Sequence, residues 1–293
     1  MQGAIRLQFR STHRLASILR HRFSTSRTTL TRDVSILSDD SISAFKAQAF
    51  EPQIPALLPR RRFGNLPAIS KWFIRGDNST TWFSLDRAYL SQFATTTVPL
   101  ELTSGDTFTR VDQPLSLLLD SQNAAKSVDA RIYLAQASLA DLPQGLRLDV
   151  PTPDLVLKAG RGDVYDTSIW IGLAPTYTPL HRDPNPNLFV QLAGTKSVRL
   201  FNPKVGRAIF AHVQASIGGH ASATMRGEEM MQGVEKRALE DAVWEDSKNH
   251  PWMNDAFECE VSAGDGLFIP KGWWHSIKGI GPGMTGSVNW WFR

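Results

Sequence analysis

From about residue 150 onward, short apolar or alternating runs recur along the chain, separated by Gly, Pro, Asn and Asp. Eight such runs are DTSIWIGL, TPLHRD, NLFVQLAG, KSVRLFNP, AFECEV, GLFIP, WWHSIKG and SVNWWF. Short strands between turn residues are typical of an all-β barrel or a double-sheet jelly roll. The pattern therefore predicts a mainly β protein with peripheral helices.

The first part of the body is less regular. Residues Ser41–Phe50 have the spacing of a short helix. The following stretch, EPQIPALLPRRRFGNLPAISKWF, is punctuated by prolines, which favour extended segments and turns over a long helix. Within it, Arg60-Arg61-Arg62 is expected to be a solvated turn.

Three further segments precede the β-rich region. Residues 82–93 (WFSLDRAYLSQF) have helical spacing, and Ser84 or Asp86 could cap the helix start. Residues 98–102 (VPLEL) are predicted to be a strand, and 131–139 (RIYLAQASL) a strand or helix edge.

The strand pattern is interrupted by an insert at about residues 206–256. Its stretch GEEMMQGVEKRALEDAVWED is predicted to be partly helical, with a break at Gly233. His212, His220 and His250 lie in this insert and are expected to be surface residues. After the insert, Gly264-Asp265 is a hairpin-turn signal between two strands.

Length and composition limit the possible classes of protein. At 293 residues and 42% hydrophobic content, the chain can form one large catalytic domain or two small ones. It has no run of about 18 apolar residues, so no membrane-spanning helix is predicted. Its one cysteine, Cys259, excludes an internal disulfide framework and suits a reducing compartment.

Charge is unevenly distributed. Residues 1–32 contain seven arginines and no acidic residue, and subtracting these seven charges from the total of +4 leaves −3 for residues 33–293. An Arg-rich, Ser/Thr-rich, acid-free leader is typical of a mitochondrial transit peptide, with cleavage expected near Phe23–Ser24. The alternative is a disordered basic arm. The slightly acidic body gives no indication of a DNA-binding surface.

Three residues form a candidate metal site. His181 and Asp183 are two apart on a predicted strand, so both side chains can point to one face. His275 follows Asp183 by 92 residues, on the strand after the GLFIP run. Two imidazoles and one carboxylate form the facial triad that holds non-haem Fe(II) and leaves positions open for oxygen chemistry. A lone strand histidine is weak evidence, but the combined pattern predicts an oxygenase.

Residues 178–203 (TPLHRDPNPNLFVQLAGTKSVRLFNP) and 264–293 together closely resemble the JmjC (cupin-like) family of Fe(II)- and 2-oxoglutarate-dependent oxygenases, especially its small hydroxylase-type members. The similarity extends through RIYLAQASLADLP and SIWIGLAPT and touches residues 50–102. It implies a double-stranded β-helix (jelly-roll, cupin) core in residues 131–293, with residues 33–130 as an N-terminal α+β segment packed on it. It also implies Fe(II) bound by His181, Asp183 and His275.

The resemblance further implies a site for 2-oxoglutarate. Lys196, fifteen residues after His181, matches the lysine that binds the distal carboxylate. Thr178 and Tyr133 match hydroxyl donors to that group, and Asn187 matches a polar residue near the chelating end. Such a carboxylate needs a cation and hydroxyl donors in a dry pocket. Taken singly, Lys196 could equally be a surface lysine, Thr178 a plain strand residue and Tyr133 a core aromatic.

The activity implied by the resemblance is that of a dioxygenase. It would consume O₂, convert 2-oxoglutarate to succinate and CO₂, and hydroxylate a C–H bond of a protein or, alternatively, an RNA substrate. Demethylation would follow if the hydroxylated carbon were an N-methyl group. The alternatives are a catalytically inactive cupin-like scaffold and a Zn or Mn cupin without an oxoacid. A mitochondrial monomer is expected, with Trp170, Trp273, Trp274, Trp290 and Trp291 mostly in the barrel core.

Overall fold

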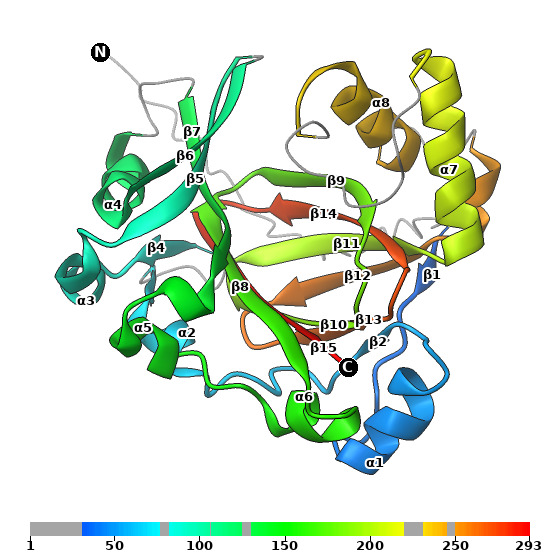
Figure 1. The fold of residues 1–293 in the computed structure, drawn as a ribbon, viewed down its shortest axis with the longest axis horizontal. Coiled ribbons are helices and arrows are strands. Elements are labelled where there is room, and N and C mark those ends of the chain that lie inside the picture. The colour runs from blue at the N-terminus through cyan, green and yellow to red at the C-terminus, as the bar shows by residue number, and fades with distance from the viewer. Residues whose placement is uncertain (1–30, 77–81, 106, 125–129, 220–230, 245–249) are drawn as a thin grey trace, which may run out of the picture.

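The structure is a computed structural model that describes residues 31–76, 82–105, 107–124, 130–219, 231–244 and 250–293. Two large sheets, one of five strands and one of eight, curve around a shared interior (Figure 1). Helices cover the outer faces of both sheets. The predicted mainly β architecture with a jelly-roll core is confirmed.

The five-stranded sheet carries the predicted histidines. Its strand order is β1-β12-β11-β14-β9, and all neighbours are antiparallel except β1 and β12. The strands are β1 (Arg32–Asp33), β12 (Phe257–Ser262), β11 (Thr195–Phe201), β14 (Trp274–Ile280) and β9 (Thr176–Arg182). Because β9 and β14 are adjacent, the two segments proposed to bind metal lie side by side.

The eight-stranded sheet has the order β2-β13-β10-β15-β8-β7-β5-β6. Its strands are β2 (Ala56–Leu57), β13 (Gly266–Ile269), β10 (Asn187–Ala193), β15 (Met284–Phe292), β8 (Val164–Leu173), β7 (Ala130–Ser138), β5 (Thr97–Ser104) and β6 (Thr107–Pro114). The eight runs predicted after residue 150 correspond to β8 to β15. The strand predicted at 98–102 is confirmed within β5. Of the segment 131–139, predicted to be a strand or helix edge, residues 131–138 lie in β7 and Leu139 begins η3.

The interior between the sheets contains an apolar cluster that shares the inward face with the histidines, since Leu200 pairs with His275 and Ile277 lies two residues after His275. Alternate residues of facing strands point inward. Buried members of this cluster are Val34, Leu57, Phe189, Val198, Leu200, Cys259, Val261, Leu267, Ile269 and Ile277. Cys259 is a free, buried thiol.

The insert forms the helical cover of the five-stranded sheet. Its helices are α7 (Pro203–Ser216), capped by the Asn202 side chain, α8 (Gly233–Val243) and the 3-10 turn η6 (Pro251–Asp255). In Figure 1, α7 and α8 lie beside β9 and β14. The partly helical prediction is confirmed within the described residues, where α8 starts at Gly233 with a φ of 72°; most of the stretch before Gly233 lies outside them.

The remaining helices cover the outer face of the eight-stranded sheet. They are α1 (Ile42–Phe45) with the π turn η1 (Lys46–Phe50), α2 (Pro67–Lys71), α3 (Arg87–Leu90) with η2 (Ser91–Phe93), α4 (Leu115–Ala124), η3 (Leu139–Asp141), α5 (Gln144–Leu148) and α6 (Asp154–Ala159). The helix predicted at Ser41–Phe50 is confirmed.

The helix predicted at 82–93 is only half correct. Its first part is β4 (Phe83–Leu85), which pairs with β3 (Phe73–Arg75), and the helix starts after Asp86, whose side chain caps it. The apolar spacing was ambiguous, because Phe83 and Leu85 alternate as in a strand, whereas Trp82, Leu85 and Tyr89 have the spacing of one helix face.

The start of the described chain is integrated into the barrel. The Arg32 N–H donates to the Ala256 carbonyl at 2.8 Å, which continues the sheet at β12. The arginine run is an exposed turn, as expected, and two of its side chains also form ion pairs: Arg60 with the buried Asp265 at 2.7 Å and Arg62 with Asp40. The predicted hairpin turn before β13 is confirmed, since the Asp265 N–H donates to the Ser262 carbonyl.

Among the described residues, no helix has the length and apolar character needed to cross a membrane. The predicted transit peptide falls almost wholly on residues 1–30, which lie outside the described part of the chain, as does His220.

Candidate metal centre and co-substrate pocket

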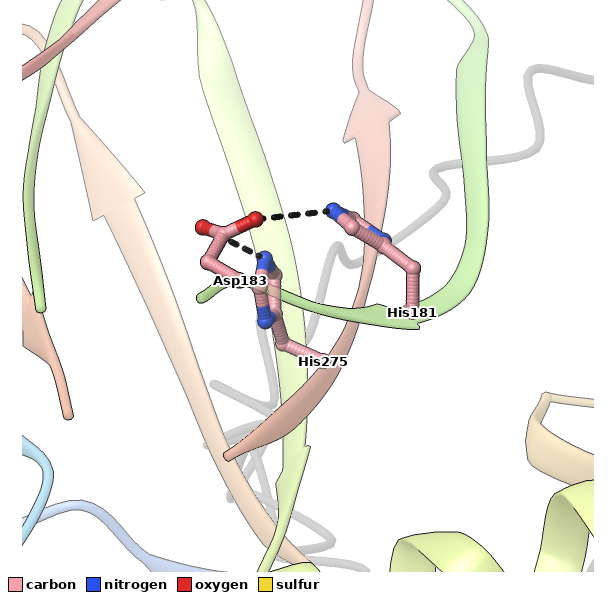
Figure 2. A group of neighbouring side chains, drawn as sticks. All are labelled: His181, Asp183 and His275. Atoms are coloured by element: carbon pink, nitrogen blue, oxygen red, sulfur yellow. Dashed lines mark ion pairs between the residues drawn. The ribbon is translucent and has the colours of Figure 1, made fainter. Parts of the chain in front are cut away.

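Two neighbouring strands bring the three candidate metal ligands together. His181 on β9 and His275 on β14 are direct partners in the strand register, so their side chains share the inward face. Asp183 lies just beyond the end of β9. Its carboxylate oxygens are 3.9 Å from His181 Nε2 and 3.8 Å from His275 Nε2 (Figure 2). One ligand atom from each residue falls within 4.8 Å of the other two, so a single ion can be shared.

Backbone carbonyls fix the orientation of both imidazoles. His181 Nδ1 lies 2.9 Å from the Pro179 carbonyl, and His275 Nδ1 lies 3.2 Å from the Trp273 carbonyl. A carbonyl only accepts, so each Nδ1 carries the proton and each Nε2 presents its lone pair. Both Nε2 atoms face Asp183, which is the arrangement that a metal ligand set requires.

Asp183 is held as an anion by neutral donors. The Asn187 amide donates to Asp183 Oδ2 at 3.1 Å, and the Trp291 indole donates to the same oxygen at 2.8 Å. Burial alone would raise the pKa of Asp183, but the imidazoles of His275 and His181 and these two hydrogen bonds hold that pKa below its ordinary value. The side chain remains charged and can serve as an anionic ligand.

His275 is kept neutral by its surroundings. Its side chain is only 2% exposed, whereas that of His181 is 21% exposed. Burial, followed by the neighbouring His181, lowers the pKa of His275 to about 4, against the opposing effect of Asp183. A neutral imidazole is the form that binds metals. The greater exposure of His181 indicates that the centre is approached from its side.

Lys196 is a buried cation in the same barrel. It lies on β11, is 3% exposed, and donates from Nζ to Ser287 Oγ at 2.8 Å. Its Nζ also lies 5.4 Å from the centre of the Phe189 ring. Burial lowers the pKa of Lys196 to about 7, and no carboxylate in the described part of the chain is paired with it. A buried ammonium without an acidic partner suits an anionic ligand.

The strand register connects this lysine with the metal centre. Lys196 pairs with Gly279 of β14, which pairs with Thr176 of β9. Thr178, two residues after Thr176 on β9, pairs with Ile277 of β14. It shares a face with the histidines and lies between the level of Lys196 and that of His181. Thr178 is thus positioned beside the path from the lysine to the candidate metal.

Tyr133 approaches the same level from the opposite sheet. Its ring covers Gly172, where an added Cβ would come within 2.2 Å of it. Gly172 pairs with Thr285 of β15. Thr285 in turn lies close to where a Cβ added at Gly279 would be, and Gly279 is the strand partner of Lys196. Burial and the nearby Glu101 raise the pKa of Tyr133, so its hydroxyl stays protonated and can donate.

Polar groups on β15 were not recognised from the sequence as part of the site. Ser287 contacts Lys196 and Trp291 contacts Asp183, while Asn289 lies between them on the same inward face. The side-chain oxygens of Asn187 and Asn289 are buried, and neither has a hydrogen-bond partner among the described residues. A signal was present, because the run SVNWWF places polar residues at alternate positions of a buried strand.

The remaining predicted residues behave mainly as expected. Trp274, Trp290 and Trp291 are buried, whereas Trp170 and Trp273 are only partly so. Trp170 packs edge-on against Trp291, at 5.7 Å between ring centres. His212 is exposed and His250 is partly buried, and both pack on Trp252 away from the metal ligands.

Comparison with protein families agrees with this geometry. The profile described as "Cupin-like domain" matches residues 90–293, which is most of the chain and includes every candidate site residue.

Curated relatives carry JmjC names. Jumonji C domain-containing protein 5 of Drosophila melanogaster is 26% identical over 91% of this chain and 61% of its own length. Lysine-specific demethylase JMJ30 of Arabidopsis thaliana is 28% identical over 73% of this chain and 46% of its own. Lysine-specific demethylase 8 of Danio rerio is 27% identical, with corresponding shares of 67% and 45%. The chain spans about half to three-fifths of the length of these relatives.

Proposed function

The chain belongs to the cupin-like JmjC family, and from this premise we propose that it is an Fe(II)- and 2-oxoglutarate-dependent dioxygenase. The observation that carries the proposal is the orientation of the two histidines. Each Nδ1 is tied to a backbone carbonyl, so both Nε2 lone pairs face one anionic carboxylate. Two neutral imidazoles and a carboxylate on one face leave open coordination positions, as oxygen chemistry requires.

In the proposed reaction, His181, Asp183 and His275 hold the metal. Asn187 and Trp291 both donate to Asp183 Oδ2, which fixes the carboxylate plane. When bound, iron and 2-oxoglutarate would supply the oxidising chemistry with O₂ as the oxidant: one oxygen atom would enter succinate as 2-oxoglutarate loses CO₂, and the other would enter a substrate C–H bond.

For 2-oxoglutarate, Lys196 would hold the distal carboxylate as a buried cation. Thr178 and Tyr133 would donate hydroxyl hydrogen bonds to it, and Asn187 would stand near the chelating end. The apolar neighbours of Lys196, among them Phe189, exclude water and strengthen the ion pair. No carboxylate of the described residues compensates the charge of this lysine, which supports an anionic ligand in this position.

We propose a protein side chain as the substrate, with RNA as the second candidate. Two relatives are named as lysine-specific demethylases, which supports a protein target. The body of the chain has a formal charge of −3, which disfavours a polyanion. Asp166, a partly buried carboxylate, pairs in the register with Trp291 beside the metal ligands and would attract a cationic side chain. Hydroxylation is the direct product, and demethylation follows where the oxidised carbon is an N-methyl.

An anaerobic Fe(II) titration tests the proposal. The expected result is a visible charge-transfer band that requires both Fe(II) and 2-oxoglutarate, and succinate formation in air that is lost in His181→Ala. No band and no succinate would instead support an inactive scaffold. Tight binding of Zn or Mn without any dependence on 2-oxoglutarate would support the remaining alternative, a Zn or Mn cupin that uses no oxoacid.

The substrate can be sought by mass spectrometry. We propose that the protein acts in mitochondria, on the basis of its arginine-rich leader. Proteomes and RNA of isolated mitochondria would be compared with and without the protein. The expected result is a peptide or nucleotide that carries one added oxygen atom only when the protein is present. Gain of methyl groups in the absence of the protein would indicate demethylation. A fusion of residues 1–30 to a fluorescent protein would test the targeting.

If a leader is removed, the contacts of the first described residues favour a cut before Thr31. Thr31 Oγ1 donates to the Glu258 carboxylate, and Arg32 pairs with Asp255. A proposed cut near Phe23–Ser24 would preserve these contacts, whereas a cut beyond Arg32 would remove β1. N-terminal sequencing of the mitochondrial protein would decide this.

A further inference from the structure

Strand β9 is irregular between two of its functional residues. His181 pairs with His275, but the next pair is Thr178 with Ile277, so three residues of β9 match two of β14. Side chains three apart point to opposite faces of a regular strand. The extra residue is a β-bulge, and it returns Thr178 and His181 to the same inward face. Pro179, which has no N–H to offer the ladder, lies inside the bulge.

The carbonyls of the bulge are both used by side chains. The Pro179 carbonyl accepts the hydrogen bond from His181 Nδ1 at 2.9 Å. The Thr178 carbonyl accepts from Ser276 Oγ at 2.8 Å. Ser276 is fully buried and follows His275 directly in β14, with its side chain on the opposite, outward face. The shape of the bulge therefore depends on a residue that contacts neither candidate metal nor co-substrate.

Ser276 is in turn bonded to the insert. The Trp244 indole N–H donates to Ser276 Oγ at 2.8 Å. An indole can only donate and a carbonyl can only accept, so the Ser276 proton points to Thr178 and its lone pair to Trp244. The three groups form one directed chain from the end of α8 to the bulge.

Two cations hold the Trp244 ring in place. The Arg199 guanidinium lies 4.6 Å and Lys278 Nζ 5.2 Å from the ring centre. Lys278 also pairs with Glu240 of α8 at 2.7 Å, and Arg199 donates to the Val243 carbonyl. The end of α8 is thereby fastened to the outer face of the sheet that carries the histidines.

We propose that Ser276 and Trp244 are positioning residues for the metal centre: their hydrogen-bonded pair sets the β9 bulge, and through it the orientation of His181 and Thr178. The inference rests on the proposed metal-dependent function and extends it to the outer face of the sheet. If the pair has this role, the packing of the insert helix α8 against the five-stranded sheet also affects metal binding.

Anaerobic titration with Co(II), followed by visible absorption, tests the pair without turnover. Ser276→Ala and Trp244→Phe are each expected to weaken Co(II) binding about tenfold and to change the intensity of the Co(II) bands, as loss of an outer support does. Phe keeps a ring between the two cations, so Trp244→Phe preserves the packing of α8. Because both variants interrupt one chain, the double variant should bind Co(II) no more weakly than either single variant.

Two further variants separate positioning from general destabilisation. Ser276→Thr retains the hydroxyl and should restore the Co(II) spectrum. Ser262→Ala removes a hydroxyl contact to Thr195 on the same sheet, away from the bulge, and should bind Co(II) as the unaltered protein does. Melting temperatures measured without metal would show whether any variant is unfolded.

The outcomes are distinguishable from those that test the proposed function. Unaltered Co(II) affinity and spectrum in both Ser276→Ala and Trp244→Phe would overturn this inference alone. Normal Co(II) binding by the unaltered protein, with no succinate formed from 2-oxoglutarate, would overturn the dioxygenase proposal and leave the positioning role intact. If the unaltered protein binds no Co(II), both are wrong.

Discussion

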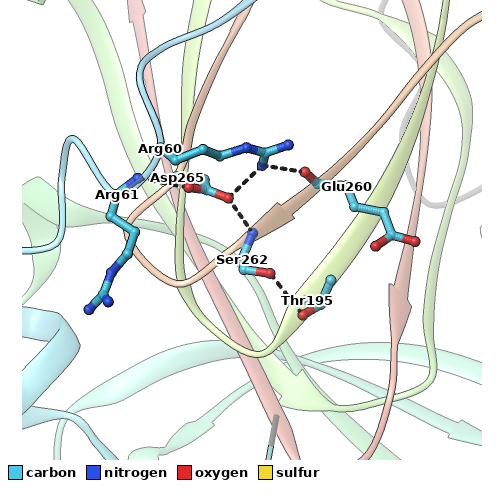
Figure 3. Close-up of polar contacts among 6 residues, drawn as sticks. All are labelled: Arg60, Arg61, Thr195, Glu260, Ser262 and Asp265. Atoms are coloured by element: carbon cyan, nitrogen blue, oxygen red, sulfur yellow. Dashed lines mark hydrogen bonds and ion pairs between the residues drawn. The ribbon is translucent and has the colours of Figure 1, made fainter. Parts of the chain in front are cut away.

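Asp183 and Asp265 are nearly buried carboxylates close to opposite ends of β10, and their partners differ in charge. Asp265 receives Arg60 Nη1 at 2.7 Å and the backbone N–H groups of Ser262 and Arg61 at 3.0 and 2.9 Å (Figure 3). Within the described part of the chain, the Asp183 carboxylate receives hydrogen bonds only from the neutral side chains of Asn187 and Trp291, both on one oxygen.

The contrast distinguishes a structural carboxylate from a ligand. Burying a charge is costly unless it is paired. Asp265 has its counter-ion within the chain and fastens the Arg60 segment to the β12–β13 turn. Asp183 faces the Nε2 atoms of two imidazoles, and no Lys or Arg among the described residues is paired with it. Lys196 shows the same imbalance with opposite sign, as a buried ammonium whose hydrogen-bond partner is a hydroxyl. The barrel thus holds an anion and a cation that are both unmatched, which suits a metal and a dicarboxylate.

Replacing Asp183 should separate binding from stability most clearly. In Asp183→Asn, the amide oxygen can still accept from Asn187 and Trp291, so we expect the unfolding free energy without metal to change by no more than about 1 kcal/mol. Loss of a whole anionic ligand should weaken Co(II) binding by well over about a hundredfold, beyond the range for an outer support. Titration and thermal unfolding of the same preparation measure both. Retained Co(II) binding would contradict the assigned ligand set.

Replacing Asp265 should give the reverse result. Asp265→Asn leaves Arg60 without its counter-ion and at least one backbone N–H unsatisfied, so we expect a loss of about 2–3 kcal/mol in unfolding free energy. Arg60 is half exposed and can be rehydrated, which limits the loss. Co(II) affinity should remain within about twofold of the unaltered protein wherever the variant is folded. Denaturant unfolding and metal titration check the two halves of the comparison.

The sequence was sufficient to predict the eight strands after residue 150 and the candidate ligands that the fold brings together, because both depend on local patterns. The eight runs that became β8 to β15 alternate in apolar character, and the His-x-Asp spacing places two side chains on one face of a strand. The register that sets His275 directly opposite His181 is a long-range property. It could be expected from the resemblance, but not from the spacing of 92 residues between Asp183 and His275.

The partners of these residues were not predictable in the same way. Arg60 lies in the exposed turn that was expected, but its ion pair with Asp265 was not predicted, because nothing local indicates that its segment lies against a turn some 200 residues later. Likewise, Ser276 lies next to a predicted ligand, yet its role depends on a bulge and on Trp244 from the insert. Whether β6 and β5 belong to a separate N-terminal segment stays a prediction, although they extend the eight-stranded sheet.

Lys196→Met tests the second unmatched charge. The thioether fills the buried space of the lysine stem but cannot pair with a carboxylate, so the affinity for 2-oxoglutarate should fall about 30-fold, the value of one charge-assisted hydrogen bond. Co(II) affinity without 2-oxoglutarate should be unchanged. Calorimetric titration of 2-oxoglutarate into the Co(II)-loaded protein measures the difference. Lys158→Met, at an exposed helical ion pair with Asp154, is the control and should bind 2-oxoglutarate normally.

The lowered pKa of Lys196 predicts a pH dependence with a definite sign. Burial brings this pKa to about 7, so the free protein loses the ammonium as the pH rises above that value. The affinity for 2-oxoglutarate should then fall by up to about tenfold per pH unit above pH 7. In the ligand-free protein this group has the opposite effect, because the unfolded lysine retains its proton up to its ordinary pKa and stability therefore rises with pH above 7.

Lys196→Arg is the variant that checks this assignment. A guanidinium stays charged across the whole range, so its affinity for 2-oxoglutarate, whatever its absolute level, should not vary with pH between 7 and about 9. A slope that persists in Lys196→Arg would place the titrating group elsewhere.

We expect the smallest effect on Co(II) binding from a substitution of Trp291. It measures how far the Asp183 carboxylate depends on its neutral hydrogen-bond donors. Trp291→Phe keeps an aromatic ring against Trp170 but removes the indole N–H that donates to Asp183 Oδ2 at 2.8 Å. Asn187 still donates to that oxygen, so Co(II) binding should weaken only several-fold, and by no more than about tenfold. Trp290→Phe is the matched control, since Trp290 is the next residue on the opposite face and its buried indole N–H has no partner among the described residues. Equal losses in the two variants would mean that ring packing, and not the hydrogen bond to Asp183, supports the metal centre.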